Sequence, residues 1–359
     1  MNQKQAINRL FLLATAPFLG MAVWMLATDS AQLMPPIAAM SSAELPQVNL
    51  SEDAAGLDGK LEKATQDSSA IQSTIMKHYD LYNESSAQVS VMLKTASEQK
   101  NKPAQIFERR ISNVLGAPTR SASSGNIELK LYTFSASSYK AYALKAELKS
   151  DKAMKMALAG DKIGKSETTL AAVNRLGGIA GVNAGGFADE SGTGKRYPTG
   201  NTIQNGKYVY GFFPSDGLSF VGLNDQRQLI GGMFNKQEEL DKLKPQFGAS
   251  FTPILLKDGK KQTIPVKWMT SPYRAARTVV GNFKNDQLLF IVTDGSDDRG
   301  SAGASLPELQ DKLQQMGIKD AYNLDGGGSS TLVWGNELIN RPSDNGRMRS
   351  MPTHFVFFK

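Results

Sequence analysis

The sequence predicts an α+β or mixed α/β fold: a mixed β-sheet domain with at least one βαβ unit, preceded by an N-terminal transmembrane helix and a helical stalk. An apolar run over residues 10–27 has the length of a membrane span, helical periodicity follows over 60–118, and alternating strand patterns with glycine-rich turns fill 119–359. Residues 1–9 are then a cytoplasmic N-terminus and residues 28–59 a flexible tether.

The apolar run extends from Leu10 to Ala27. Eighteen residues at about 1.5 Å each span roughly 27 Å, close to the ~30 Å of a membrane core. Lys4 and Arg9 precede the run, and no Lys or Arg follows until Lys60, which places the later residues outside the cytoplasm. A cleaved signal peptide is the alternative, but its apolar core is usually only about 7–15 residues. We therefore expect a retained single-pass anchor, and both interpretations put the domain outside.

Composition narrows the class of protein. The chain has no cysteine, so disulfides cannot stabilise an exported fold, and a domain of roughly 235 residues must rely on its own core. Export without disulfides is common in Gram-positive bacteria. The net charge of +7 and the pI of 9.3 suit an anionic cell wall. No basic cluster carries interleaved aromatic residues, so a nucleic-acid partner is not expected.

The tether and stalk differ in pattern. Residues 28–59 are rich in Ser, Ala, Pro and acidic residues, which indicates a flexible segment. In the stalk, residues 60–118, large side chains recur at helical spacing. They are Ile71, Ile75, Tyr79 and Tyr82. Pro103 is expected to break this helix, and a second amphipathic stretch follows over 106–115.

The βαβ prediction comes from one continuous stretch. The apolar run 288–293 has the length of a strand. Ser305 and Glu308 form a capping box for a helix that ends before Gly317, and a second strand is expected over 321–324. Strand, helix and strand in this order predict two parallel strands with a right-handed crossover.

Each of the two strands ends in an acid followed by glycine, Asp294-Gly295 and Asp325-Gly326. Ligands of α/β sheets bind at the edge formed by the carboxyl ends of the strands. We therefore expect Asp294 and Asp325 at one ligand-binding edge.

Four motifs then occur in a distinctive order. They are Asn183-Ala184-Gly185-Gly186-Phe187, Arg277-Thr278-Val279-Val280-Gly281, Asp294-Gly295, and Asn323-Leu324-Asp325-Gly326-Gly327-Gly328-Ser329-Ser330. This ordered set resembles the phosphodiester glycosidase family, over about residues 126–359. Two departures stand out. The family often has Asn-Gly-Gly-Phe-Phe at the first motif, and Met348-Arg349 stands here where Glu-Arg is usual.

The resemblance implies a hydrolase that cleaves the glycosidic C–O bond of a sugar-1-phosphodiester. Residue chemistry agrees, because such a site needs cations for the phosphate and a carboxylate near the anomeric carbon. The predicted catalytic residues are Asp325 and Asp294, with the choice of base left open. The predicted substrate-binding residues are Arg277, Arg349, Asn183, Gly185, Gly186, Gly326, Gly327, Gly328 and Ser329.

Several of these residues also have structural interpretations. Asp294 with its glycine can form a simple turn, and Asn183 can cap one. Arg277 can be a buried ion-pair partner, and Arg347 can serve in place of Arg349. The two histidines, His78 and His354, are expected to be structural.

No cofactor is expected, although Asp294, Asp297 and Asp298 can provide oxygen ligands for calcium. The expected partners are a phosphodiester-linked carbohydrate from the cell wall or an extracellular polysaccharide, and the membrane through the N-terminal helix. Two other functions stay open: a non-catalytic module that binds such polymers during their assembly, and a phosphodiesterase that cuts the P–O bond.

Overall fold

The computed structural model describes residues 50–296 and 301–359 of the chain. The chain divides into two units, Met1–Met92 and Leu93–Lys359. Among the described residues no helix combines the length and the apolar character that a membrane crossing requires. The transmembrane helix predicted over residues 10–27 lies outside this part of the chain.

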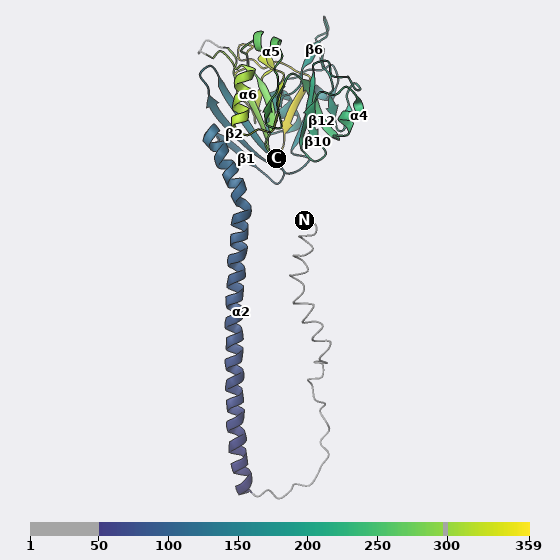
Figure 1. The fold of residues 1–359 in the computed structure, drawn as a ribbon. Helices are drawn as coiled ribbons and strands as arrows, with labels where there is room; N and C mark the ends of the chain where they lie inside the picture. Colours follow the sequence, from purple (N-terminus) through teal and green to yellow (C-terminus); the bar gives the residue numbers. More distant parts are fainter. Residues whose placement is uncertain (1–49, 297–300) are drawn as a thin grey trace, which may run out of the picture. The chain divides into compact units, whose positions relative to one another are not determined.

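The first long element is α2 (Leu50–Leu115), one uninterrupted helix (Figure 1). It begins within the segment predicted as tether and continues past Pro103, where a break was expected. Proline removes one backbone hydrogen bond, and a helix can continue through it when flanking residues favour helix. The domain boundaries drawn from the sequence stay predictions.

The second unit is built on an eight-stranded sheet. In spatial order its strands are β1 (Arg120–Ser123), β2 (Ile127–Ser135), β3 (Lys140–Leu148), β16 (Leu288–Thr293), β15 (Thr278–Asn282), β17 (Asp320–Leu324), β13 (Ile254–Lys257) and β14 (Lys260–Lys261). Every pair of adjacent strands in this sheet is antiparallel.

The prediction of a mixed α/β sheet with a βαβ unit was therefore wrong, because the domain is mainly antiparallel. The helix between the two strands, α6 (Leu306–Gln315), does begin with the expected capping box of Ser305 and Glu308. However, β15 lies between β16 and β17 and pairs antiparallel with both, so that Val280 is opposite Phe290 on one side and Tyr322 on the other. The order of elements along the chain correctly predicted that β17 runs in the same direction as β16. It could not show that β15 lies between these two strands.

Three further sheets complete the domain. The first contains, in spatial order, β11 (Leu229–Gly232), β10 (Ser219–Asn224), β12 (Pro245–Phe251), β8 (Ile203–Gln204) and β9 (Lys207–Tyr208). The second contains β19 (Glu337–Leu338), β18 (Leu332–Trp334), β5 (Ala180–Asn183), β20 (Thr353–Phe357) and β4 (Met154–Leu158). The third is formed by β6 (Phe187–Asp189) and β7 (Arg196–Pro198). The remaining helices are α3 (Thr169–Leu176), α4 (Gln237–Asp241), α5 (Val266–Thr270) and the 3-10 turns η1 (Ala159–Asp161) and η2 (Gly327–Ser329).

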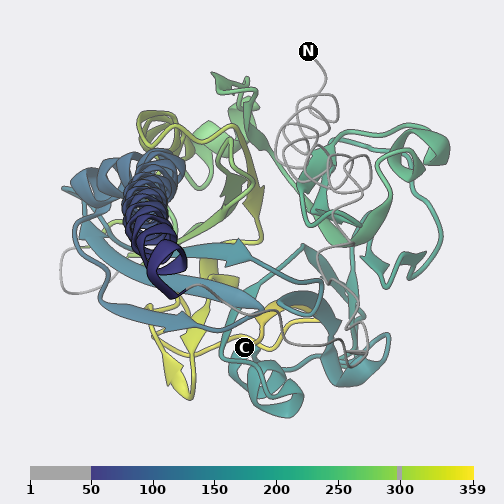
Figure 2. The ribbon, with the colours of Figure 1, turned by 90° about the horizontal axis from the view of Figure 1, so that it is seen from below.

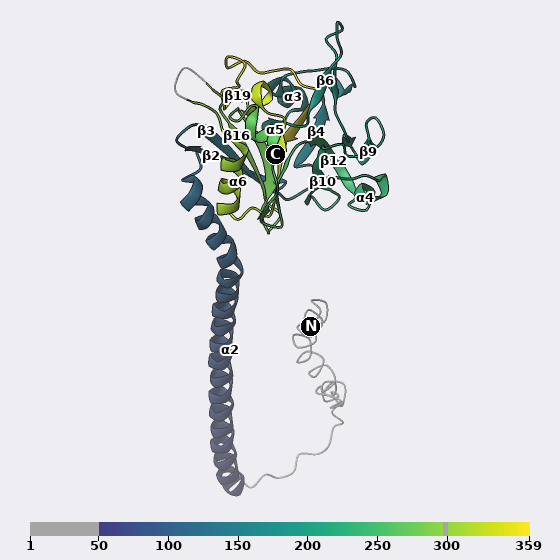
Figure 3. The same ribbon diagram turned by 45° about the horizontal axis from the view of Figure 1, so that its top comes forward.

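The large sheet separates two apolar cores. One face packs against the sheets that contain β5 and β12, with Phe290 and Tyr322 contributed by the large sheet. The other face packs against α6 and the last turns of α2, where Ile111 and Leu115 are buried. Figures 2 and 3 show α6 and the green segment around β10 and β12 on opposite sides of the domain. With both faces covered, the strand ends of the large sheet remain as places where polar side chains can gather.

Candidate active site

Three of the predicted site residues meet at one edge of the large sheet. Thr278, the first residue of β15, is paired with the ends of both β16 and β17. Arg277 therefore lies between Asp294, which follows β16, and Asp325, which follows β17. Two steps between neighbouring strands place the backbones of the two acids roughly 10 Å apart. Although the sheet is antiparallel, β16 and β17 run in the same direction, so the expected edge exists.

Asp325 has an environment that changes its acidity. Burial raises the pKa of this carboxyl from 3.8 to about 6, and hydrogen bonds from Ser329 and Gly326 and the charge of Arg349 limit the rise. The backbone N–H of Gly326 donates to Oδ1 over 3.0 Å. A pKa near 6 leaves the group mainly ionised at neutral pH while keeping it able to accept a proton.

Asn183 holds the backbone of Asp325 in place. Its fully buried side chain donates through Nδ2 to the carbonyl oxygen of Asp325 over 2.6 Å. Its Oδ1 accepts from the hydroxyl of Thr278 over 2.8 Å and from the N–H of Thr331 over 3.0 Å. The amide was predicted to bind substrate, and that role stays a prediction. In the structure its contacts with Asp325, Thr278 and Thr331 position the backbone of the acid.

Arg349 lies beside the glycine-rich turn that follows Asp325. Its Nε and Nη2 donate to the two carboxylate oxygens of Asp344, each over 3.0 Å, and Nη1 reaches Ser329 Oγ at 3.4 Å. Arg347, considered as a substitute, has an exposed side chain. Asp344 was missed in the sequence, where the only signal was an acid five residues before Arg349 in a polar loop.

Gly328 makes room for this ion pair. A Cβ atom at this position would lie 2.2 Å from Arg349 Nη2 and 2.2 Å from Asp344 Oδ1. Glycine is therefore required here because the two charged groups lie directly against its backbone. The role of Gly328 in substrate binding stays a prediction; in the structure this glycine provides the space for Arg349.

The other predicted glycines serve packing and hydrogen bonding within the protein. A Cβ atom on Gly185 or Gly186 would lie 2.7 Å from Ala249 or 2.8 Å from the ring of Phe251, so both allow β12 to approach closely. The N–H of Gly327 donates to Ala276 O over 2.8 Å. Gly326 donates to Asp325 itself, so neither of these two amides is presented to a ligand.

Arg277 is a buried cation, only 2% exposed. Its Nη2 donates to Pro272 O over 2.8 Å and its Nε to Ala304 O over 3.3 Å. Burial lowers the pKa of this guanidinium to about 10. No carboxylate within residues 50–296 and 301–359 forms an ion pair with it, so the interpretation as an ion-pair partner is not supported there. Its positive charge adds to the attraction of this edge for an anion.

Asp294 lines a pocket. Its Oδ1 accepts the backbone N–H of Arg341 over 2.7 Å, and the hydroxyl of Tyr142 lies 3.5 Å from Oδ2. Burial, followed by the charge of Asp294, raises the pKa of Tyr142 to about 12. The pocket has a volume of about 440 Å³ and is also lined by Lys140. Asp294 thus takes part in a polar site with cations nearby and is not only a turn residue.

The described residues contain no group of three or more carboxylate, histidine or cysteine side chains arranged to hold a metal ion. The calcium hypothesis involved Asp297 and Asp298, which lie outside the described residues. It stays a hypothesis.

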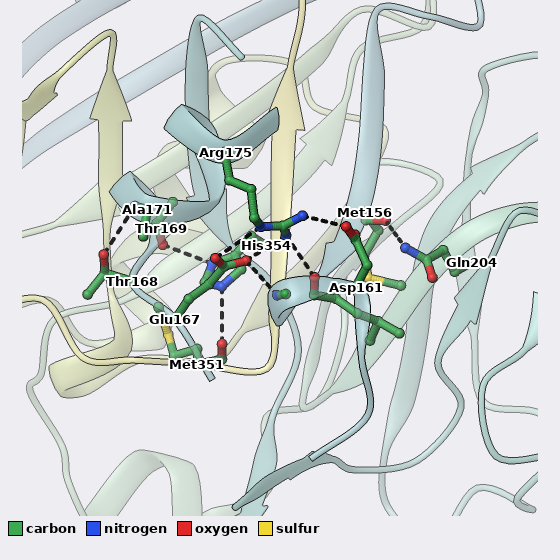
Figure 4. A network of polar contacts seen from close by, with 12 residues as sticks. Met156, Asp161, Glu167, Thr168, Thr169, Ala171, Arg175, Gln204, Met351 and His354 are labelled. Carbon is green, nitrogen blue, oxygen red and sulfur yellow. Dashed lines mark hydrogen bonds and ion pairs between the residues drawn. The ribbon is translucent and has the colours of Figure 1, made fainter. Parts of the chain in front are cut away.

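A buried network fixes the far end of the loop that carries Arg349 (Figure 4). The His354 ring accepts at Nδ1 from the hydroxyl of Thr169 over 3.2 Å and donates from Nε2 to Met351 O over 3.1 Å, an assignment made from these partners. Complete burial lowers the pKa of His354 to about 4, so the ring is neutral. Glu167 and Met351 exchange two backbone hydrogen bonds. His354 is structural, as expected, and it holds the carbonyl of Met351, two residues after Arg349.

A family model described as phosphodiester glycosidase matches residues 177–358, just over half of the chain. The chain belongs to the phosphodiester glycosidase family. All the residues predicted to form the site lie within the matched range, which confirms the resemblance drawn from the four motifs.

Curated relatives agree over a shorter stretch. The phosphodiester glycosidase chain is 39% identical over 71 residues to N-acetylglucosamine-1-phosphodiester alpha-N-acetylglucosaminidase of Mus musculus and 37% identical over 71 residues to the Homo sapiens protein. These alignments cover 20% of this chain and only 13% of each relative.

The fold is similar to that of the zebrafish N-acetylglucosamine-1-phosphodiester alpha-N-acetylglucosaminidase catalytic domain, solved in a form auto-inhibited by its pro-peptide. The TM-score is 0.55 at 21% identity, over 68% of this chain and 86% of that one. At this identity the likeness concerns the fold alone. It shows that the antiparallel architecture described above is shared with that domain.

Proposed function

We propose that the protein hydrolyses a sugar-1-phosphodiester at the bond between the anomeric carbon and the phosphate oxygen. The observation that carries the proposal is the pairing of an acid whose pKa is about 6, Asp325, with a neighbouring cation, Arg349, which lies beside the glycine-rich turn that follows the acid. Membership of the phosphodiester glycosidase family supports it. A carboxylate for the sugar and a cation for the phosphate are the two groups this reaction needs.

Arg349 and Asp325 act at opposite ends of the bond that is cleaved. The C–O bond to the phosphate breaks and its electron pair leaves with the phosphate monoester. A phosphate monoester is already a good leaving group, so strong acid assistance is not required. Arg349 stabilises the charge on the departing phosphate, and the buried charge of Arg277 adds to the positive potential at the edge.

On the sugar side, water adds its oxygen to the anomeric carbon, and a carboxylate accepts the proton or stabilises the positive charge that develops on the ring. Asp325 is the better candidate because its pKa lies near neutral pH. Asp294 lines the neighbouring pocket with Lys140 and Arg341, and we assign it to substrate placement there.

The test is hydrolysis of a panel of sugar-1-phosphodiesters by the purified protein in ¹⁸O-labelled water. The proposal predicts label in the released sugar, and in the control variant Asp325→Asn the labelled sugar should form about 10²–10⁴ times more slowly. Label in the phosphate would mean P–O cleavage and contradict the proposal. Binding of the panel without turnover, unchanged in Asp325→Asn, would mean a polymer-binding module.

We further propose that the substrate is an extracytoplasmic polymer, of a cell wall or an extracellular polysaccharide. The support is the apolar run over residues 10–27 and the lack of Lys and Arg between it and Lys60, a pattern typical of export. Digestion of the domain by protease added to cells stripped of their wall would support this location. Complete protection until the membrane is lysed would contradict it.

A further inference from the structure

Within the first unit, residues 57–92 of α2 expose an unusual amount of apolar surface. Eleven large apolar side chains of this segment are between 52% and 72% exposed, and seven of the eleven lie along one face of the helix. The seven are Leu57, Leu61, Ile71, Ile75, Tyr82, Val89 and Met92. An isolated helix gains most of its stability by burying one face, so a helix with this face in water lacks its main stabilising contact.

These seven side chains follow a heptad repeat. Successive positions alternate in spacing by four and three residues over the whole segment, and eight of the eleven positions are apolar. The positions are Leu57, Leu61, Ala64, Ser68, Ile71, Ile75, His78, Tyr82, Ser85, Val89 and Met92. A helix has 3.6 residues per turn, so a strict repeat of 3.5 over five heptads keeps one seam facing a partner only if two helices coil around each other.

We propose that residues 57–92 pair with the same segment of a second copy of this chain to form a two-stranded coiled coil. A second copy is favoured over an unrelated partner because a heptad seam is complementary to itself: each apolar side chain fits between those of an identical seam. Ile75 and Val89 occupy positions of the kind called a in the heptad, where β-branched residues favour two strands.

The area is sufficient for a stable pair. At roughly 100 Å² on average for the seven exposed side chains, the seam presents an area on the order of the ~800 Å² per partner that a stable interface buries. The segment is 36 residues long, so it extends over about 54 Å. Tyr79 and Leu81, both exposed, flank the seam and widen it.

The residues beside the seam do not oppose pairing. In a parallel arrangement Lys60 faces Thr65 of the other copy and Asp67 faces Gln72, so none of these positions brings like charges together. The three polar seam residues, Ser68, His78 and Ser85, reduce stability and restrict the register, as isolated polar residues do in natural coiled coils. The pairing concerns assembly and is independent of the proposed function.

The first experiment measures the mass of the purified full chain by sedimentation equilibrium, in a mild detergent that is density-matched by the buffer. The expected mass is that of two chains of 38.9 kDa each. Ile75→Asp should give a single chain, because it places a charge in the seam. Ser73→Asp, two residues earlier on the outer face of the same helix, is the matched control and should leave the mass unchanged.

Circular dichroism of the three proteins shows whether a lower mass reflects lost pairing or a lost domain, because the β-sheet signal of residues 119–359 should be the same in all. A single-chain wild type at tens of micromolar would overturn the proposal. So would an Ile75→Asp protein with the wild-type mass, or an assembly of three or more chains.

Cysteine cross-linking provides an independent measurement, since the chain contains no cysteine of its own. Ile75→Cys should form a disulfide between two chains on mild oxidation with copper phenanthroline, whereas Ser73→Cys should not. Ile75 lies near the middle of the segment, so the result holds for parallel and antiparallel pairs. Equal cross-linking at the two positions, or none at either, would overturn the proposal.

Discussion

Arg349 and Asp344 form a two-point ion pair, with both carboxylate oxygens of the acid accepting from the guanidinium at 3.0 Å. The pair leaves Nη1 of Arg349 directed at Ser329, on the turn that follows Asp325. Asp344 therefore orients the arginine, and Gly328 provides the space in which the pair lies.

Gly328→Ala should raise KM for the sugar phosphodiester by about tenfold or more with a smaller effect on kcat. The added methyl group overlaps Arg349 Nη2, so the cation proposed to bind the phosphate is displaced. Gly125→Ala is the control, because nothing lies within 4 Å of a Cβ atom there. Equal KM values for the two variants would show that the placement of Arg349 does not matter for binding.

Asp325→Asn should lower kcat by about 10²–10⁴, the range for a positioned acid–base group, and should at the same time stabilise the fold. The folded protein raises the pKa of this carboxyl from 3.8 to about 6, so keeping it ionised at pH 7 costs folding free energy. Replacing the carboxylate by a neutral amide should therefore raise the free energy of unfolding at pH 7 by a value on the order of 1–3 kcal/mol.

Thermal unfolding of both proteins between pH 4 and 8 checks the second half of this prediction. A raised pKa destabilises the protein fully above the folded value and not at all below the unfolded value. The advantage of Asp325→Asn should therefore be complete at pH 7 and disappear as the pH falls from about 6 towards 4. A variant that is less stable than wild type at pH 7 would contradict the burial of an ionised acid.

The pH dependence of activity should reflect the same group. If Asp325 acts as the carboxylate, kcat/KM should rise with pH through about 6. Because the charge of Arg349 holds this pKa down, Arg349→Gln should move the rise to higher pH as well as weaken binding. Arg347→Gln, in the same loop with an exposed side chain, should leave the midpoint unchanged. If the midpoint of the pH profile is the same in Arg349→Gln as in the wild type, the titration belongs to another group.

The last turns of α2 should be needed for a stable domain. Ile111 and Leu115 are buried in the core beneath the large sheet, so a chain that starts at residue 119 loses them. Ile111→Ala should lower the free energy of unfolding by about 2–5 kcal/mol, whereas Ile106→Ala, where the side chain is 58% exposed, should have little effect. Urea denaturation measures both variants. Equal denaturation midpoints for Ile111→Ala and Ile106→Ala would show that the last turns of α2 do not stabilise the domain.

Activity should survive removal of metal ions. The proposed reaction relies on two arginines and a carboxylate, and the described residues contain no cluster that could hold a metal ion. Treatment with EDTA should leave most of the turnover. Complete loss that zinc or manganese restores would instead favour a metal-dependent phosphodiesterase.

Local patterns predicted much of this molecule and failed where strands from distant segments meet. The capping box at Ser305 and the strand over 288–293 depend on neighbouring residues, and both were correct. The position of β15 between β16 and β17 depends on pairing between distant segments, which periodicity does not record. Asp325 could be selected from its motif, but Asp344 acquires its importance only from its contact with Arg349.

The side-chain amide of Asn183 joins three segments that are far apart in the sequence. It contacts Asp325 and Thr331 after the last helix and Thr278 on the central strand, from its own position at the end of β5. The contacts with Thr278 and Asp325 can form only when both the large sheet and the sheet that contains β5 are assembled. Hydrolytic activity should therefore appear late in folding and in a single step. A nascent or partly unfolded chain should then have no activity on nearby polymers.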